Sequence, residues 1–330
     1  MQYTYFGSTG IQVSRLCLGT MSFGNEADQT ASMSLMDQAF DTGINFFDTA
    51  DVYCGGETER IVGHWLKDHR EEVVLATKTY FPSGIGINNQ GSSRRHILKG
   101  VEDSLQRLQT DYIDILYLHH WDDHTPIEQS LSAASQLVDQ GKVHYIAVSN
   151  FAAWQCQKAI MTAQANHLAP VTAIQPMYSL IKRTAEIEIL PMAQAQDLAV
   201  CPYSPMGSGM LTGKYHRSEK GRISINAMYK ERYKNSEYME VAGRFIAYAQ
   251  DHDVDPAALS VAWVNAHPAI TSSIVGVWNP DQLTTALKSV DISLSTDEWI
   301  DISNLGIPQP HATDREDMTH LKITSKEDDA

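Results

Sequence analysis

Residues 45–53 read Asn-Phe-Phe-Asp-Thr-Ala-Asp-Val-Tyr, a short apolar run that ends at Asp48 and is followed five residues later by Tyr53. A brief apolar run bounded by polar residues predicts a buried strand. The carboxylate therefore comes at the end of a strand, and the phenol lies in the loop after it. In a barrel of parallel strands, this edge carries the active site.

The same alternation of short β-rich runs and amphipathic stretches continues along the chain. The predicted strands are residues 15–18, 45–47, 73–76, 113–118, 145–148, 173–175, 199–203 and 272–275. The predicted helices are residues 29–42, 57–67, 94–108, 126–140, 154–166, 185–196, 256–266 and 280–290. Eight strand–helix units favour an α/β fold, a (β/α)8 TIM barrel, over an open sheet.

Several segments fall outside this alternation. We expect an N-terminal β-hairpin, an extra helix near 238–251 after the seventh strand, and a C-terminal loop and helix extension. Long loops at 80–91 and 207–236 follow the third and seventh strands, where barrels build their sites. No internal boundary stands out, so residues 1–330 are expected to form one domain. Its end, about 313–330, reads as a mobile acidic tail.

Two more strand ends carry chemistry of the same kind as Asp48. Lys78 ends the third predicted strand and His119 ends the fourth. A phenol has a pKa of about 10, and a neighbouring ammonium lowers that value. A carboxylate can hold the ammonium, and a histidine can position a carbonyl oxygen. Together with Tyr53, these residues suit the addition of a proton to a carbonyl oxygen while a hydride reaches its carbon.

Composition narrows the possible partners. With 25 Lys and Arg against 40 Asp and Glu, the net charge is −15, which disfavours nucleic acid and anionic membranes as partners. The four cysteines are scattered, no signal peptide precedes the first strand, and no apolar run approaches the ~20 residues of a membrane helix. The His and Asp residues at 119–124 match no zinc spacing, so no metal is expected. We expect a cytoplasmic protein with reduced thiols.

Two motifs carry a family resemblance. The stretch 47–53, followed by Gly-Glu-Thr-Glu at 56–59, resembles the signature of the aldo-keto reductase superfamily. The stretch 203–214, Tyr-Ser-Pro-Met-Gly-Ser-Gly-Met-Leu-Thr-Gly-Lys, does so as well. The similarity runs from Gly7 to Gly276 and is greater to the bacterial branch related to potassium-channel β subunits than to the mammalian aldose reductases.

The resemblance implies a nicotinamide-dependent oxidoreductase and assigns roles by position. Tyr53 would be the general acid, Lys78 would lower its pKa, Asp48 would pair with Lys78, and His119 would orient the carbonyl. Ser149, Asn150 and Gln175 would bind the carboxamide, Tyr203 would stack on the nicotinamide, and the 206–211 loop with Lys214 would hold the pyrophosphate. The full cofactor set is Gly19, Thr20, Met21, Ser149, Asn150, Gln175, Tyr203, Ser204, Pro205, Met206, Gly207, Ser208, Gly209, Leu211, Lys214, Gly276, Trp278 and Gln282.

The coenzyme itself, NADPH or NADH, stays open at this point. NADPH-preferring relatives commonly carry an arginine two residues after the glycine at Gly276, and this chain has Trp278 there. An indole cannot make the bidentate contact of a guanidinium with the 2′-phosphate. The residue therefore favours NADH or dual use, unless basic residues near Lys220 and Arg222 supply the missing contact.

The substrate is expected to be a small carbonyl compound, an aldehyde, ketone or sugar. Phe23, Tyr80 and Trp121 lie on loops beside Tyr53 and His119, where they would either line the substrate pocket or only pack the loops. A second class of function is a redox-sensing regulatory subunit with slow turnover, as in the channel β proteins. The complete tetrad favours an enzyme, and the oligomeric state is open.

Overall fold

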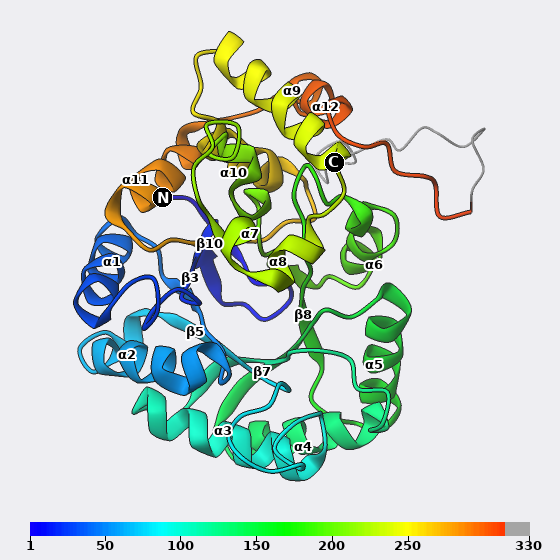
Figure 1. The fold of residues 1–330 in the computed structure, drawn as a ribbon. Helices are drawn as coiled ribbons and strands as arrows, with labels where there is room; N and C mark the ends of the chain where they lie inside the picture. Colours follow the sequence, from blue (N-terminus) through cyan, green and yellow to red (C-terminus); the bar gives the residue numbers. More distant parts are fainter. Residues whose placement is uncertain (314–330) are drawn as a thin grey trace.

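A computed structural model describes residues 1–313 and shows eight parallel strands ringed by helices (Figure 1). The strands follow one another in the order β10-β3-β4-β5-β6-β7-β8-β9. Their bounds are β3 Leu16–Gly19, β4 Phe46–Asp48, β5 Val74–Thr79, β6 Ile113–Leu118, β7 Val143–Ser149, β8 Val171–Gln175, β9 Ala199–Val200 and β10 Ser273–Gly276. The predicted (β/α)8 TIM barrel is confirmed, and every strand lies within two residues of a predicted run except at the ends of β5 and β9.

The seam between β9 and β10 closes the barrel with few hydrogen bonds. The seventh strand was predicted to reach Tyr203, but β9 ends at Val200. Pro202 has no amide hydrogen to give to a ladder. Its carbonyl instead accepts from the Ile274 amide at 2.9 Å, and an isolated bridge joins Tyr203 to Ile274.

Helices connect successive strands and pack on the outside of the barrel (Figure 1). They are α1 Gln29–Asp41, α2 Glu57–Leu66, α3 Arg94–Leu108, α4 Ile127–Asp139, α5 Ala153–Ala165, α6 Ile189–Ala195, α10 Pro256–Ala266 and α11 Pro280–Leu287. The α10 prediction matches to the residue because Asp255 caps it, accepting from the Ala257 and Ala258 amides, and Pro256 occupies its first position. The predicted helix at 185–196 is divided into a short turn, Thr184–Glu186, and α6.

The segments outside the barrel also have defined structure. The N-terminal hairpin pairs β1 Tyr3–Tyr5 with β2 Gln12–Ser14. The long insertion contains α7 Arg222–Ile225 and α8 Ala227–Arg232, which were not predicted, and the extra helix is α9 Glu237–Asp251. The C-terminal extension includes α12 Thr296–Asn304. The predicted acidic tail from 314 onward lies outside the described residues.

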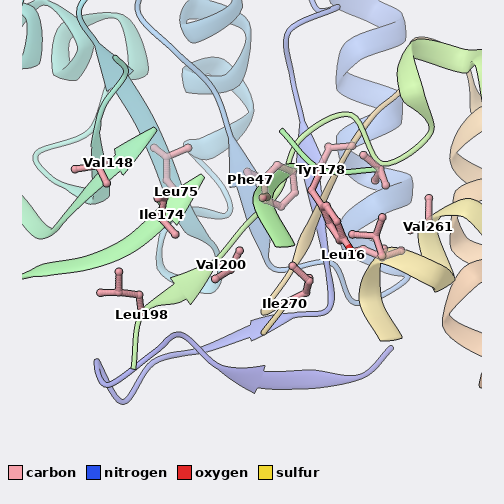
Figure 2. Close-up of a cluster of buried hydrophobic side chains, with 14 of the residues drawn as sticks. Leu16, Phe47, Leu75, Val148, Ile174, Tyr178, Leu198, Val200, Val261 and Ile270 are labelled. Atoms are coloured by element: carbon pink, nitrogen blue, oxygen red, sulfur yellow. The ribbon is translucent and has the colours of Figure 1, made fainter. Parts of the chain in front are cut away.

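Two clusters of buried side chains pack against the strands, one inside the barrel and one outside it. Inside the barrel, small residues and a few large ones fill the space, and Phe6 from the hairpin packs edge-on against Phe46 at a centroid distance of 5.8 Å. A larger cluster lies between strands and helices, and Figure 2 shows part of it, including Leu16, Leu75 and Val261. These packed layers hold the carboxyl ends of the strands in fixed positions. Within residues 1–313, no helix is both long and apolar enough to cross a membrane.

Candidate active site

A cavity of about 1150 Å³ lies at the carboxyl ends of the strands. Its wall includes strand-end residues of β3, β4, β7, β8 and β10, and also the 207–212 loop and α8. The volume is slightly above that of ordinary small-molecule sites, which leaves room for a long ligand beside a small one.

The predicted tetrad comes together at this cavity. The Lys78 Nζ donates to Asp48 Oδ1, to the Thr49 carbonyl at 2.7 Å and to the Tyr53 hydroxyl at 3.4 Å. Gln175 Nε2 donates to the other Asp48 oxygen at 2.8 Å. Lys78 is fully buried beneath the cavity wall, whereas Asp48 and Tyr53 line it. A buried ammonium with a carboxylate, a carbonyl and a phenol around it is fully coordinated.

Charge and burial act on these groups in opposite directions. Burial raises the pKa of the Tyr53 phenol, and the Lys78 ammonium offsets part of that rise. Burial lowers the pKa of Lys78, but the interactions with Asp48 and Tyr53 outweigh it and the pKa is raised. Lys78 therefore remains an ammonium at neutral pH. The expected lowering of the Tyr53 pKa is thus one contribution among several and does not set the final direction.

His119 lines the cavity opposite Tyr53, with ring centroids 6.2 Å apart. Burial, followed by the charges of Lys78 and His120, holds the pKa of His119 well below its usual value. The imidazole is therefore neutral at neutral pH. Its Nδ1 is buried and has no hydrogen-bond partner among the described residues. His120 next to it is exposed and turns its Nδ1 toward the Trp121 carbonyl, at 2.7 Å.

The three residues expected to bind the carboxamide are joined to one another. Asn150 Nδ2 donates to the His119 carbonyl at 3.0 Å and to Ser149 Oγ at 3.1 Å. The Tyr203 hydroxyl donates to Asn150 Oδ1 at 2.7 Å. Ser149 Oγ donates to the Gln175 carbonyl at 3.0 Å. All four residues line the cavity, and their bonds fix the ring of Tyr203 beside the tetrad.

The other predicted cofactor residues separate into two groups. Those that line the cavity are Gly19, Thr20, Met21, Ser204, Pro205, Met206, Ser208, Gly209, Lys214, Gly276, Trp278 and Gln282. Gly207 and Leu211 do not line it and are buried in the loop. A side chain at Gly209 would lie 2.8 Å from Lys214 Cε, so glycine allows the Lys214 stem to cross the loop.

Two cations face the Trp278 ring at one end of the cavity. Lys214 Nζ lies 5.0 Å from the ring centroid, and the Arg222 guanidinium carbon lies 5.8 Å from it. Arg222 pairs with Glu26 at 3.4 Å through Nε, while its Nη2 is buried with no hydrogen-bond partner among the described residues. Gln282 does not point freely into the cavity, because its Oε1 accepts from the Trp278 amide at 3.0 Å.

Three residues expected near the substrate are not part of the cavity wall. Phe23 is fully buried in the core, which favours the alternative that it only packs the loop. Trp121 packs against Phe151 and Trp154, and Tyr80 lies against His120 outside the wall. Phe81, the neighbour of Tyr80, lines the cavity instead and contacts the His119 ring edge-on at 4.9 Å.

Residues of α8 complete the wall and were missed by the sequence analysis. Met228, Tyr229 and Arg232 face the cavity, and the Tyr229 hydroxyl lies 3.7 Å from Met21 Sδ on the far side. Six residues are too few to show a helical period. The available signal was Asn226, whose side chain caps α8 by accepting from the Met228 and Tyr229 amides. Within residues 1–313, no group of His, Cys, Asp and Glu side chains is arranged to hold a metal ion.

A parallel barrel with a Tyr–Lys–Asp–His tetrad at its carboxyl edge defines a class of oxidoreductases. The family model described as "Aldo/keto reductase family" matches residues 15–307, and the chain belongs to this family of nicotinamide-dependent oxidoreductases. Its relatives include "Uncharacterized oxidoreductase YrpG" of Bacillus subtilis (strain 168), which is 40% identical over 89% of this chain and 92% of that protein.

Two other relatives differ in the function that their names state. "Probable voltage-gated potassium channel subunit beta" of Oryza sativa subsp. japonica is 35% identical over 91% of this chain and 95% of its own length. "Norsolorinic acid reductase A" of Aspergillus parasiticus is 34% identical over 90% of this chain and 79% of its own length. The expected relation to channel β subunits is thereby confirmed.

Proposed function

We propose that this protein is an enzyme that transfers a hydride between a nicotinamide coenzyme and a carbonyl or alcohol substrate, with Tyr53 as general acid and base. The observation that carries the proposal is the contact of the Tyr53 hydroxyl, 3.4 Å from Lys78 Nζ, at the wall of a cavity. An acid must lie within hydrogen-bonding reach of the oxygen that it protonates, and Tyr53 and His119 both face the same space.

In the reducing direction, Tyr53 gives its proton to the carbonyl oxygen. Lys78 favours the phenolate that this leaves, and Asp48 keeps Lys78 in position. Neutral His119 can donate one hydrogen bond to the same oxygen without competing as the acid. The bound nicotinamide supplies the hydride, and the products are an alcohol and the oxidised coenzyme.

We place the nicotinamide against Tyr203 and the adenosine end near Trp278. Tyr203 has its hydroxyl tied to Asn150, which leaves the ring face for stacking. The cations of Lys214 and Arg222 stand beside Trp278, where phosphate groups would neutralise them. Tyr203 and Trp278 line the same cavity, so one ligand could contact both.

We further propose that NADPH is the preferred coenzyme. The buried, unpartnered Nη2 of Arg222 is a donor that lacks an acceptor, and a buried donor without a partner costs free energy. A 2′-phosphate would provide that acceptor. NADPH-preferring relatives commonly contact the 2′-phosphate through an arginine at the position of Trp278. In this protein Arg222 would make that contact instead, and the Trp278 indole would pack against the adenine.

The relatives named as channel β subunits raise a regulatory function as the second candidate. Such a function needs coenzyme binding but little turnover. The complete tetrad and the access of Tyr53 and His119 to the cavity support catalysis instead.

Steady-state oxidation of NADPH with 4-nitrobenzaldehyde tests the proposal. We expect turnover by the wild type and a loss of roughly 10²- to 10⁴-fold in kcat for Tyr53→Phe, the range for general acid catalysis. The Kd for NADPH, followed by quenching of Trp fluorescence, should stay within a factor of about three in this variant. Wild-type turnover by Tyr53→Phe would show that another group is the acid, and binding without turnover by the wild type would favour the regulatory function.

A further inference from the structure

Arg232 is a cation at the cavity wall without an acidic partner. Three arginines line the cavity, and two of them are ion-paired, Arg217 with Glu219 at 2.6 Å and Arg222 with Glu26 at 3.4 Å. Arg232 forms no ion pair with any residue of the part of the chain that the structure describes. In a chain of net charge −15, a cation left unpaired at the wall of a site needs an explanation.

Aromatic and thioether groups hold the Arg232 side chain from one side. Its guanidinium carbon lies 5.2 Å from the centroid of the Tyr229 ring, and its Nη2 lies 3.8 Å from Met228 Sδ. Neither neighbour satisfies a guanidinium, because a ring face and a thioether accept hydrogen bonds only weakly. The donors of Arg232 are therefore available to a ligand.

Arg232 is near enough to Tyr203 to act on it electrostatically, whereas the cations that contact the Trp278 ring are Lys214 and Arg222. Burial raises the pKa of Tyr203 to about 12, and the charge of Arg232 is the influence that opposes this rise. Tyr203 is bonded to Asn150, and Asn150 to the His119 carbonyl. Arg222 also lies near the Tyr229 ring, at 5.8 Å, but its other aromatic contact is Trp278.

We propose that Arg232 binds an anionic group of the substrate, so that the preferred substrates are carbonyl compounds that also bear a carboxylate or a phosphate ester. This rests on the proposed function. A guanidinium fork matches both anions in geometry, and one that is stacked on a ring loses little freedom when it binds them. The net charge of −15 disfavours anions in general, so a cation at the cavity wall is needed to attract them.

A pair of substrates that differ only in charge tests this inference. The probes are 4-carboxybenzaldehyde and its neutral methyl ester, each reduced with NADPH by the wild type, Arg232→Gln and Lys234→Gln. Lys234 is the matched control, because it lies two residues further on, pairs with Glu231 and does not line the cavity. We expect Arg232→Gln to lose roughly 10- to 100-fold in kcat/KM for the carboxylate and to keep its activity on the ester, the range for a hydrogen bond to a charged group. Lys234→Gln should behave as the wild type.

The other outcomes separate the possible errors. Equal loss on both substrates would overturn the inference, since a structural role would act on both. A higher Kd for NADPH in Arg232→Gln than in the wild type would also overturn the inference, because it would show that Arg232 binds the coenzyme. If the wild type reduces 4-nitrobenzaldehyde but neither probe, the proposed function stands, and the inference is decided by calorimetric binding of 4-carboxybenzoate to the NADP⁺ complex, which must weaken in Arg232→Gln if the inference is correct. If the wild type reduces none of the three aldehydes, the proposed function fails, and the inference, which rests on it, fails with it.

Discussion

At the scale of single residues, two aspartates three positions apart have opposite surroundings. Asp48 accepts from the Lys78 ammonium and from Gln175, whereas Asp51 is buried and forms no ion pair with any residue among 1–313. Burial, followed by the charge of Glu59, raises the pKa of Asp51 to about 7. The residues 47–53 predicted the position of Asp48 and Tyr53. They could not predict this difference, because the neighbours of Asp51 come from other elements.

The Asp51→Asn variant should remove a pH dependence of stability. An unfolded aspartate has a pKa of about 3.9, so between about pH 4 and pH 7 the unfolded chain has lost a proton that the folded protein keeps. The stability contributed by protonated Asp51 is therefore present below pH 4 and lost as the pH rises through 7. Relative to wild type, Asp51→Asn should gain on the order of 2–4 kcal/mol at pH 8 and almost nothing at pH 4.

Urea unfolding across that pH range measures the effect, with the exposed Asp251→Asn as a control. A constant difference between Asp51→Asn and wild type from pH 4 to pH 8 would mean that Asp51 is ionised throughout the range.

The choice of coenzyme is also decided by a single side chain in our proposal. Arg222→Gln should weaken NADPH binding by roughly 10- to 100-fold, the range for a charged hydrogen bond, and change NADH binding by less than about threefold. Fluorescence titration with each coenzyme measures both values. Lys220→Gln is the control, since Lys220 is two residues away and does not line the cavity. Equal weakening of NADPH and NADH binding by Arg222→Gln would place Arg222 away from the 2′-phosphate.

At the scale of elements, the long helices were predicted and the shortest helices were not. Helices such as α3 show their apolar stripe over several turns, and their bounds were found. The four residues of α7 and the six of α8 show no period, and their place over the cavity depends on tertiary contacts such as Tyr229 with Met21. The tetrad was predicted because its residues lie at or just after strands that the sequence shows. Arg232 was not predicted, because it lies in α8, which the sequence does not show.

The contact of α2 with α3 is close enough to require a glycine. A Cβ at Gly63 would lie 2.5 Å from the Arg107 carbonyl oxygen and 2.6 Å from Leu108 Cα, which are backbone atoms that cannot turn aside. Gly63→Ala should therefore destabilise the protein by about 1–3 kcal/mol, despite the better helix propensity of alanine. Thermal unfolding measures this. Gly243→Ala in α9 is the matched control, because its nearest contact is the His216 side chain at 3.4 Å. A melting temperature equal to that of wild type in Gly63→Ala would show that the two helices can separate without cost.

At the scale of the whole molecule, the fold was predictable because its repeat is long. Eight strand–helix alternations indicate a barrel even when single bounds are wrong by a few residues. How the barrel closes could not be predicted from the sequence. The seam between β9 and β10 depends on a few hydrogen bonds, such as that from the Ile274 amide to the Pro202 carbonyl. The net charge of −15 disfavours nucleic acid and anionic membranes as partners. The structure adds that four cations line one cavity, namely Lys214, Arg217, Arg222 and Arg232.

This distribution of charge predicts a salt dependence of coenzyme binding. Cations that meet phosphates at a partly open site lose attraction as ionic strength rises, and the Debye length falls from about 10 Å at 0.1 M to about 3 Å at 1 M. We expect the Kd of NADPH to rise several-fold between these salt concentrations, and that of NADH to rise less because it has one phosphate fewer. Titration in NaCl measures both. Identical salt slopes for the two coenzymes would contradict a contact between the cavity cations and the 2′-phosphate.

The arginines that face the cavity all come from one uninterrupted stretch, the insertion between β9 and α9. The tetrad comes from β4, β5 and the segment after each of β4 and β6, far away along the chain. An exchange of this single insertion between homologous genes would replace every one of those arginines in one event and leave the chemistry of the tetrad untouched. With Arg222 and Arg232 acting as we propose, coenzyme preference and substrate preference would be inherited together in this one segment, separately from the reaction itself.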